Sequence, residues 1–174
     1  MSQEIIWAPW RLEFVKGESP GALPEELENL PEGAEPDCFL CRAVPPGDDR
    51  RRLVAGRGSL TVTVLNRYPY NNGHLLVSPK RHVGRLDDLT ADEHLELMRT
   101  VTRLVARLEK LLAAEAFNVG LNLGRPAGAG LPGHLHWHIV PRWNGDTNFM
   151  PALAGVRVIP QSLESLWELL HEAE

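Results

Sequence analysis

Three histidines alternate with apolar residues in the segment His134-Leu135-His136-Trp137-His138. Successive side chains of a β-strand point to opposite faces, so the three histidines share one face while Leu135 and Trp137 turn to the other. Neighbouring histidines would lie two strand rises apart, roughly 6.6 Å at the backbone, which lets them converge on a phosphate or a metal ion. A polar edge strand with chance histidines is the alternative, but the strict alternation of three of the chain's seven histidines argues against it.

The length of 174 residues predicts a single domain, 1–174, with a substantial hydrophobic core. A net charge of -5 and a pI near 5.8 give no electrostatic signature of nucleic-acid binding. No apolar run is long enough to span a bilayer, and the N-terminus lacks the charged head and long apolar stretch of a signal peptide. We therefore expect a cytoplasmic protein with neither nucleic acid nor a membrane as a partner.

The N-terminal region divides into an apolar arm and a polar loop. Trp7 and Trp10 are too costly to leave in water, so the arm should pack on the body of the protein or on a second subunit. Residues 17–36 are rich in Pro, Glu and Gly, which is typical of a surface loop with partial disorder.

Alternating apolar residues and turn signals predict an antiparallel sheet. Residues 59–65 and 74–78 predict two strands, joined by a turn over 67–73 that contains Pro69 and Gly73. Residues 117–123 and 134–140 predict two more strands, connected by the Gly-rich segment 124–133.

Two amphipathic helices complete the predicted secondary structure. Thr90 and Glu93 form a capping box, and leucines and valines recur behind it at helical spacing, so one long helix should run from about 90 to 114. Ser162 begins a short C-terminal helix. Hairpins with a helix inserted between them predict the α+β class: an antiparallel sheet with one long helix and a C-terminal helix packed on it.

Cys38 and Cys41 are the chain's only cysteines. In a reducing compartment, two cysteines separated by two residues indicate a metal or redox site rather than a structural disulfide. Taken alone, the pair fits two small buried residues as well as it fits half of a zinc site.

The order of these parts resembles the histidine triad (HIT) family over most of the chain. The matching pieces are Leu65 to Pro69, Gly73 to His82, Leu86 to Thr90, Asn118 to Gly124 and His134 to Arg142. Trp7 to Arg11 and Asn144 to Phe149 further resemble a bacterial branch of the family that contains diadenosine tetraphosphate phosphorylases. The resemblance implies a HIT-like sheet and nucleotide chemistry.

A neutral imidazole on a rigid strand can attack phosphorus and form a nucleotidyl-histidine, provided that its other ring nitrogen donates to a fixed acceptor. The resemblance implies that His136 is this nucleophile and that His138 contacts the scissile phosphate and the leaving-group oxygen. It also implies that His74 is a buried histidine that supports the triad. A satisfied core histidine is the alternative for His74.

Further residues are implied as substrate contacts. By resemblance Asn66 meets the ribose and Asn122 a phosphate, although turn or cap roles are more common for a lone asparagine. Small residues around Gly128 and Gly130 let backbone N–H groups approach an anion, unless the segment is merely a flexible turn. Trp143 fits an aromatic plate near a purine and a packing role equally well.

The chain departs from many HIT proteins just before the first triad histidine. Where they place Ser, Thr or Gln three or four residues upstream, this chain has Gly130 and Leu131. The missing hydroxyl leaves open how the leaving group is assisted and how fast the reaction is.

The resemblance also implies a metal site. Some bacterial members complete a cysteine pair with the histidine after the hairpin and with the first triad histidine, here His82 and His134. Cys38, Cys41, His82 and His134 would form the closed set of two thiolates and two imidazoles expected of structural zinc. His134 would then hold the catalytic strand through the metal, and no organic cofactor is expected.

Together these parts imply an enzyme that cleaves diadenosine tetraphosphate, or another dinucleoside polyphosphate, through a nucleotidyl-His136 intermediate. The branch resemblance favours inorganic phosphate as the acceptor, and thus phosphorolysis to ATP and ADP. Hydrolysis of the same substrates or of adenosine phosphoramidates is the alternative within the enzyme class. A zinc-stabilised nucleotide-binding or interaction module with little turnover is the alternative from another class. HIT proteins are commonly homodimers, so a homodimer is expected by resemblance.

Overall fold

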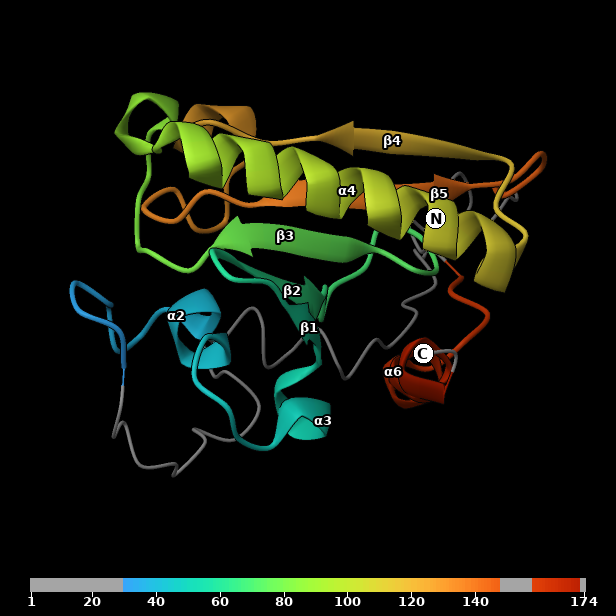
Figure 1. The fold of residues 1–174 in the computed structure, drawn as a ribbon. Coiled ribbons are helices and arrows are strands. Elements are labelled where there is room, and N and C mark those ends of the chain that lie inside the picture. The colour runs from blue at the N-terminus through green and yellow to red at the C-terminus, as the bar shows by residue number, and fades with distance from the viewer. Residues whose placement is uncertain (1–29, 148–157, 173–174) are drawn as a thin grey trace, which may run out of the picture.

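A central antiparallel sheet organises the fold of the computed structural model, which describes residues 30–147 and 158–172. Within these residues five strands pair in the order β1-β2-β3-β5-β4 (Figure 1). They are β1 (Val54–Arg57), β2 (Thr61–Leu65), β3 (Leu75–Pro79), β4 (Ala116–Gly120) and β5 (Trp137–Arg142). The helices are α2 (Phe39–Ala43), α3 (Asp49–Arg52), α4 (Ala91–Leu112) and α6 (Leu163–Glu172), with 3-10 turns at Leu86–Asp88 and Arg125–Ala127. The predicted α+β class is confirmed.

The predicted hairpin is formed by β2 and β3. These strands pair from Thr61 opposite Pro79 to Leu65 opposite Leu75. Gly73 ends the connecting turn with a φ of +77°, and a Cβ at this position would lie 2.6 Å from Leu112 Cδ1. The turn therefore requires glycine immediately before His74, both for its backbone angle and for space.

The sequence pattern does not predict β1. Its four residues include Gly56, and its register with β2 shifts between Val54 and Gly56. Such a short, irregular segment becomes a strand because β2 lies beside it, which local propensity does not encode.

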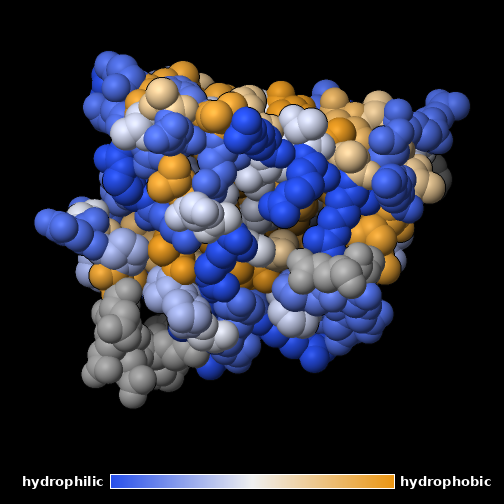
Figure 2. Space-filling view, viewed as in Figure 1, coloured by the Kyte–Doolittle hydropathy of each residue, from blue (hydrophilic) through white to orange (hydrophobic). Residues whose placement is uncertain are grey.

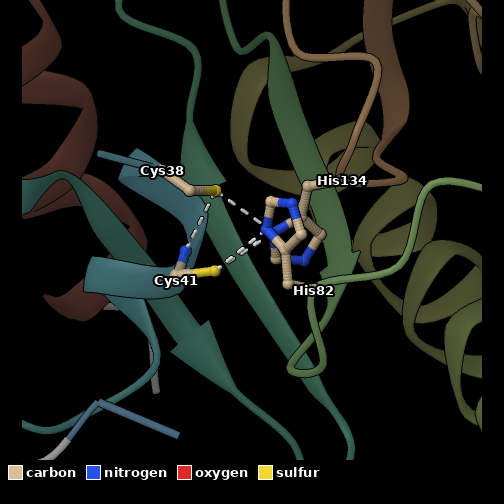
Figure 3. Close-up of side chains that lie close together, drawn as sticks. All are labelled: Cys38, Cys41, His82 and His134. Carbon is tan, nitrogen blue, oxygen red and sulfur yellow. Dashed lines mark hydrogen bonds between the residues drawn. The ribbon is translucent and has the colours of Figure 1, made fainter. Parts of the chain in front are cut away.

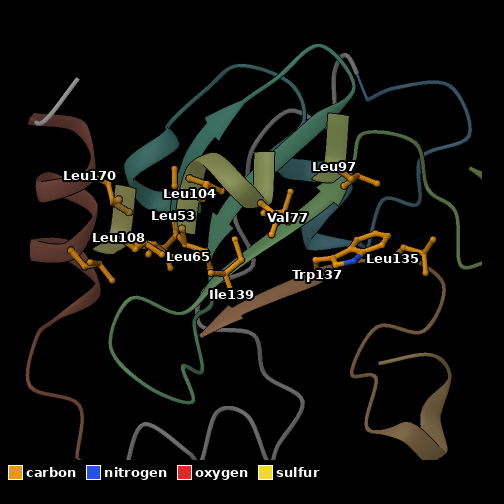
Figure 4. Close-up of a cluster of buried hydrophobic side chains, with 14 of the residues drawn as sticks. Leu53, Leu65, Val77, Leu97, Leu104, Leu108, Leu135, Trp137, Ile139 and Leu170 are labelled. Atoms are coloured by element: carbon orange, nitrogen blue, oxygen red, sulfur yellow. The ribbon is translucent and has the colours of Figure 1, made fainter. Parts of the chain in front are cut away.

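The longest helix, α4, lies across one face of the sheet (Figure 1). The predicted capping box closes its first turn: the Thr90 hydroxyl accepts from the Glu93 N–H at 3.2 Å, and the Glu93 carboxylate accepts from the Thr90 N–H at 2.8 Å. Its buried stripe packs on β2, β3 and β5 in the cluster of Figure 4: Leu97, Val101, Leu104 and Leu108 against Leu65, Leu75, Val77, Trp137 and Ile139. Each buried leucine stabilises the fold by roughly 1.5–3 kcal/mol. The predicted helix is confirmed to within two residues at its ends.

The C-terminal helix α6 packs at the β1 side of the same core. The Ser162 hydroxyl accepts from the Ser165 N–H at 3.2 Å, as the prediction of a helix start at Ser162 requires. Leu166 and Leu170 are buried, and the Trp167 indole N–H donates to the Val54 carbonyl at 2.9 Å. None of the described helices combines the length and apolar character of a membrane span.

The opposite face of the sheet is covered in part by α2. Val54, Val62, Val64 and Leu76 pack there against Leu40, Cys41 and Ala43. His138 lies on this face, because it pairs directly with Leu76 and opposed residues point the same way. On its other side His138 pairs with Gly120 of β4, and nothing lies within 4 Å of where a Gly120 side chain would begin. The surface beside His138 is thus open among the described residues. Trp7, Trp10 and most of the predicted loop 17–36 lie outside those residues.

Candidate functional site

The structure separates the three alternating histidines into a pair and a single residue. The rings of His136 and His138 lie 5.2 Å apart on the open face of β5. The ring of His134 instead lies 4.9 Å from that of His82, next to the two cysteines. The expected strand over 134–140 begins only at Trp137, since the preceding segment pairs with the loop after β3 through a Leu135 N–H to Val83 carbonyl bond of 2.8 Å. The convergence of all three histidines on one small group is therefore not observed.

Backbone contacts decide where the proton of His136 resides. Its Nδ1 lies 2.8 Å from the His134 carbonyl oxygen, which can only accept a hydrogen bond. Nδ1 therefore carries the proton, and in the neutral ring Nε2 carries the lone pair. This is the tautomer that an attacking imidazole needs.

A chain of hydrogen bonds fixes the tautomers of His74 and His138 in the same way. The Tyr70 N–H donates to His74 Nδ1 at 3.0 Å, and the Asn66 side-chain amide contacts the same nitrogen at 3.2 Å. Because Nδ1 of His74 accepts, its Nε2 carries the proton and donates to His138 Nδ1 at 2.9 Å. His138 must then carry its own proton on Nε2. That nitrogen is buried and has no hydrogen-bond partner among the described residues, so a donor is left for a ligand.

Burial keeps both of these histidines neutral. It lowers the pKa of His74 to about 3, helped by the charges of His138 and His136. It also lowers the pKa of His138 to about 4, with a smaller contribution from His136. The tautomers assigned to His74 and His138 are therefore those of uncharged rings at neutral pH.

Cys38, Cys41, His82 and His134 form a cluster of metal-ligand type (Figure 3). The His134 Nε2–H donates to the Pro79 carbonyl at 2.9 Å, which leaves Nδ1 unprotonated and aimed at the sulfurs. His134 Nδ1 lies 3.2 Å from Cys38 Sγ and 3.6 Å from Cys41 Sγ, and His82 Nδ1 lies 3.3 Å from Cys41 Sγ. Tetrahedral zinc with usual bond lengths places sulfur and nitrogen ligands about 3.5 Å apart. The donor set and its spacing therefore fit zinc.

The Cys38 thiol also needs a cation to ionise. Burial raises the pKa of the Cys38 thiol to about 12. A thiolate at this position is therefore disfavoured unless a positive charge such as a metal ion offsets the cost of burial.

An ion pair with one buried partner, which sequence reasoning missed, fixes the segment that carries His82. The Arg81 guanidinium donates to both Glu93 carboxylate oxygens, each at 2.7 Å, and to the Asp88 carbonyl at 2.9 Å. Glu93 is also the capping-box residue of α4. The capping pattern reveals Glu93, but nothing in the spacing reveals that Arg81 is its partner.

The predicted substrate contacts Asn66, Asn122 and Gly130 have different neighbours in the structure. The Asn66 side-chain oxygen accepts from the Tyr68 N–H at 2.9 Å, so Asn66 forms the turn that was the alternative to ribose binding. Asn122 lies 3.5 Å from the Gly128 carbonyl, and Gly128 has a φ of +91°. Gly130 is exposed, with nothing within 4 Å of a Cβ position.

Trp143 packs against the end of α4. Its indole N–H donates to the Ala113 carbonyl at 2.9 Å and contacts the Leu112 carbonyl at 3.2 Å. These bonds support the packing alternative for Trp143.

Comparison with known proteins points to one family. A family model described as HIT domain matches residues 51–145. A protein named AP-4-A phosphorylase from Mycobacterium tuberculosis is 41% identical over 165 residues, which cover 95% of this chain and 81% of that protein. A Schizosaccharomyces pombe protein named bis(5'-nucleosyl)-tetraphosphatase (asymmetrical) is 40% identical over 90 residues, 52% of this chain and 49% of that protein. A solved zinc-bound histidine triad family protein from Mycobacterium smegmatis has a TM-score of 0.58 and 28% identity, covering 70% of this chain and 82% of that one.

We expect acid to destabilise the fold through His74. An unfolded histidine titrates near pH 6.5, whereas burial lowers the pKa of folded His74 to about 3. Between these values the unfolded chain binds the proton and the folded chain does not. The contribution of neutral His74 to the free energy of unfolding is therefore complete above about pH 6.5. It decreases as the pH falls toward 3, by up to about 1.4 kcal/mol per pH unit.

Urea unfolding of the wild type and of His74→Gln, from about pH 7 to about pH 4, measures this contribution. His134 and His138, whose pKa burial also lowers, remain in both proteins. The variant should therefore show a shallower loss of stability with acid, whatever its stability at neutral pH. Equal slopes would contradict the assignment of His74 as a buried neutral group.

Proposed function

This chain belongs to the HIT domain family, and on that premise we propose that it is an enzyme that cleaves dinucleoside polyphosphates through a nucleotidyl-His136 intermediate. The observation that carries the proposal is the pairing of two complementary ring nitrogens. His136 presents a lone pair on Nε2, and His138, 5.2 Å away between ring centres, presents a buried Nε2–H without a partner among the described residues. One nitrogen suits a nucleophile and the other a donor to negative charge.

The first step follows from this geometry. His136 Nε2 attacks the α-phosphorus of one nucleoside, a P–N bond forms, and the P–O bond to the departing nucleoside phosphate breaks. The Nδ1–H of His136 stays on the His134 carbonyl and stabilises the ring as it becomes positive. The His138 Nε2–H donates to the oxygen on which negative charge develops. In the second step an acceptor oxygen attacks phosphorus and the P–N bond breaks, which restores neutral His136.

Phosphate is the acceptor that we propose. A relative 41% identical over 95% of this chain is named a phosphorylase of AP-4-A. With diadenosine tetraphosphate and inorganic phosphate as substrates, the products would be ATP and ADP. Asn122 and the backbone around Gly128 and Gly130 are the proposed phosphate contacts, and Asn66 stays a proposed ribose contact.

Hydrolysis is the second candidate. The relative from Schizosaccharomyces pombe is named a tetraphosphatase, although it matches only 52% of this chain. A nucleotide-binding module with little turnover is the third, and Gly130 and Leu131, in place of a hydroxyl or amide side chain, are its best support.

The fate of labelled phosphate distinguishes these candidates. We expect slow consumption of diadenosine tetraphosphate in phosphate-free buffer and much faster consumption as phosphate is added, with ADP and ATP formed in equal amounts. Phosphorolysis places the label in ADP, because the acceptor phosphate becomes the β-phosphate. Anion-exchange separation of the products measures this.

The control for this experiment is His136→Ala. It should lower turnover by about 10³-fold or more with either acceptor while nucleotide binding persists. Unlabelled AMP beside ATP, at a rate indifferent to phosphate, would replace the phosphorylase assignment with the hydrolase. Binding by the wild type without any product would favour the binding module.

We further propose that Cys38, Cys41, His82 and His134 hold one structural zinc ion. Four donors without an open position leave the metal no direct part in the reaction. The ion would tie α2 and the segment after β3 to the start of the catalytic strand. The zinc-bound protein from Mycobacterium smegmatis shares this fold. A reduced, metal-bound cysteine pair also fits the cytoplasmic location expected from the sequence.

Cys38→Ser should lower zinc content and melting temperature together, since structural zinc contributes directly to folding. Elemental analysis and thermal melting measure both quantities, and after chelation the wild type and the variant should melt alike. Thr90→Ala is the matched control: it removes the N-cap of α4 at a cost of about 1 kcal/mol but should keep one zinc per chain. Purified wild type that lacks metal and is as stable as the chelated protein would rule out the site.

A second copy of this chain is the partner that we propose for the β4 side of the molecule. β4 is an edge strand without a neighbour on its outer side among the described residues, and most of it is exposed. Beside it α4 carries a second apolar stripe, and Figure 2 shows hydrophobic residues along this upper edge. We define the β4 surface by this strand edge and by Leu95, Met98, Val105 and Val119, of which Leu95, Met98 and Val119 are 44% to 49% exposed.

The two flanks of α4 differ in a way that favours this partner. The flank toward β1 is polar: Glu96 accepts from the Leu60 N–H at 2.7 Å, and Arg107 contacts the Leu170 carbonyl. The flank toward β4 has the apolar stripe. An exposed strand edge beside apolar side chains invites strand addition, and two identical edges pair antiparallel about a two-fold axis.

Val119→Glu should convert a dimer into a monomer, because it places a charge at the centre of the β4 surface. Sedimentation velocity measures the mass, and circular dichroism checks that the fold is kept. Arg103→Glu, on the exposed polar flank of α4, is the control and should stay dimeric. A monomeric wild type, or a dimer unaffected by Val119→Glu, would refute the proposed interface.

A further inference from the structure

Tyr70 touches both buried histidines of the site through two separate groups. It lies in the turn between β2 and β3, four residues before His74. Its backbone N–H donates to His74 Nδ1 at 3.0 Å. Its ring lies 4.6 Å from the ring of His74 at an interplanar angle of 41°, and 5.7 Å from that of His138 at only 11°. The amide therefore fixes His74 Nδ1, while the ring lies against both imidazoles and is nearly parallel only to that of His138.

The turn that carries Tyr70 is tied to the end of the catalytic strand. The Asn71 side chain donates to the Pro141 carbonyl at 3.1 Å and to Asp146 at 2.9 Å. Asp146 in turn accepts from the Arg142 guanidinium at 2.5 Å and 2.9 Å. The position of Tyr70 is therefore set by β5, the strand that also carries His138.

One hydrogen bond does not by itself hold an imidazole in place. The Nδ1 of His138 accepts from His74, but its Nε2 has no partner among the described residues. Unless its faces are held, the ring can rotate out of that single bond, and the contact that fixes its tautomer is then lost. The ring of His136 is inclined to it at 58°, whereas the Tyr70 ring is nearly parallel to it. Offset stacking of this kind restrains the plane of a ring.

We propose that the Tyr70 ring is a positioning residue for His138. The Tyr70 ring holds the plane of the His138 imidazole. In that orientation His138 Nδ1 keeps its hydrogen bond from His74, and the Nε2–H faces the reacting phosphate. This inference rests on the proposed function, because it gives His138 the task of donating to the leaving group. In this proposal Tyr70 acts through His138 and not by contact with the substrate.

Three variants separate the ring from the amide. Tyr70→Phe keeps the stacked ring, Tyr70→Leu keeps apolar cover without stacking, and Tyr70→Ala removes both. All three keep the backbone N–H that fixes His74. In nitrogen-15 NMR spectra of the full-length protein without substrate, His74 should thus keep its tautomer in every variant. His138 should keep a single Nε2–H tautomer in the wild type and in Tyr70→Phe, and should show exchange between tautomers in Tyr70→Leu and Tyr70→Ala.

Turnover supplies the second measurement. Tyr70→Ala and Tyr70→Leu should lower kcat by about 5- to 10-fold with KM changed by less than about twofold, and Tyr70→Phe should restore the wild-type kcat. A tautomer of His138 that is unchanged in Tyr70→Ala would overturn the proposal. A change in the tautomers of both His74 and His138 would also overturn the proposal, because it would mean that Tyr70 only maintains the conformation of the turn. The NMR spectra do not depend on turnover. A wild type without activity would therefore refute the proposed function, while the spectra would still test whether Tyr70 positions His138.

Discussion

The antiparallel pairing of β3 with β5 is the contact on which the site depends. These strands are far apart in the chain, and their register places Leu76 directly opposite His138. The same pairing brings the Ser78 hydroxyl to the Leu135 carbonyl at 2.7 Å and the His134 ring to the Pro79 carbonyl at 2.9 Å. Since side chains alternate along a strand, a slip of one residue would turn His138 into the core beneath α4. The apolar face that carries Trp137 and Ile139 prevents that slip.

Backbone carbonyls that fix the tautomer of an imidazole are the physical principle that the His136–His138 pair and the cysteine–histidine cluster share. An uncharged histidine has one proton, so a fixed acceptor on one nitrogen leaves a lone pair on the other. The His134 carbonyl does this for His136, and the Pro79 carbonyl does it for His134. The first lone pair faces the open surface and the second faces two sulfurs. Adjacent histidines thereby acquire different chemistry from backbone oxygens alone.

An ion pair links the segment that carries His82 to helix α4. His82 faces Cys41, and its neighbour Arg81 binds the Glu93 carboxylate in the first turn of α4. Arg81 holds the pKa of Glu93 at about 2, so the carboxylate remains charged although it is buried. The same carboxylate caps α4 and anchors the segment that carries a cluster ligand. Loss of that charge would disturb both regions, because Arg81 would lose its counter-ion and α4 would lose its capping carboxylate.

Local spacing in the sequence determined the elements whose signals lie within a few residues. The Thr90 to Glu93 capping box and the leucine periodicity specify α4, and alternation in 134–138 places His136 and His138 on one face. Nothing local, however, predicts β1, which needs β2 beside it, or the separation of His134 from the other two histidines. Only the tertiary structure decided which ring nitrogens carry protons, that Tyr70 stacks on His138, that Arg81 pairs with Glu93 and that Trp143 caps α4. The reason is physical. Strand and helix periodicity depend on residues that are close in the sequence. The position of a proton depends on donors and acceptors from distant segments, and spacing along the chain does not predict which of these come into contact.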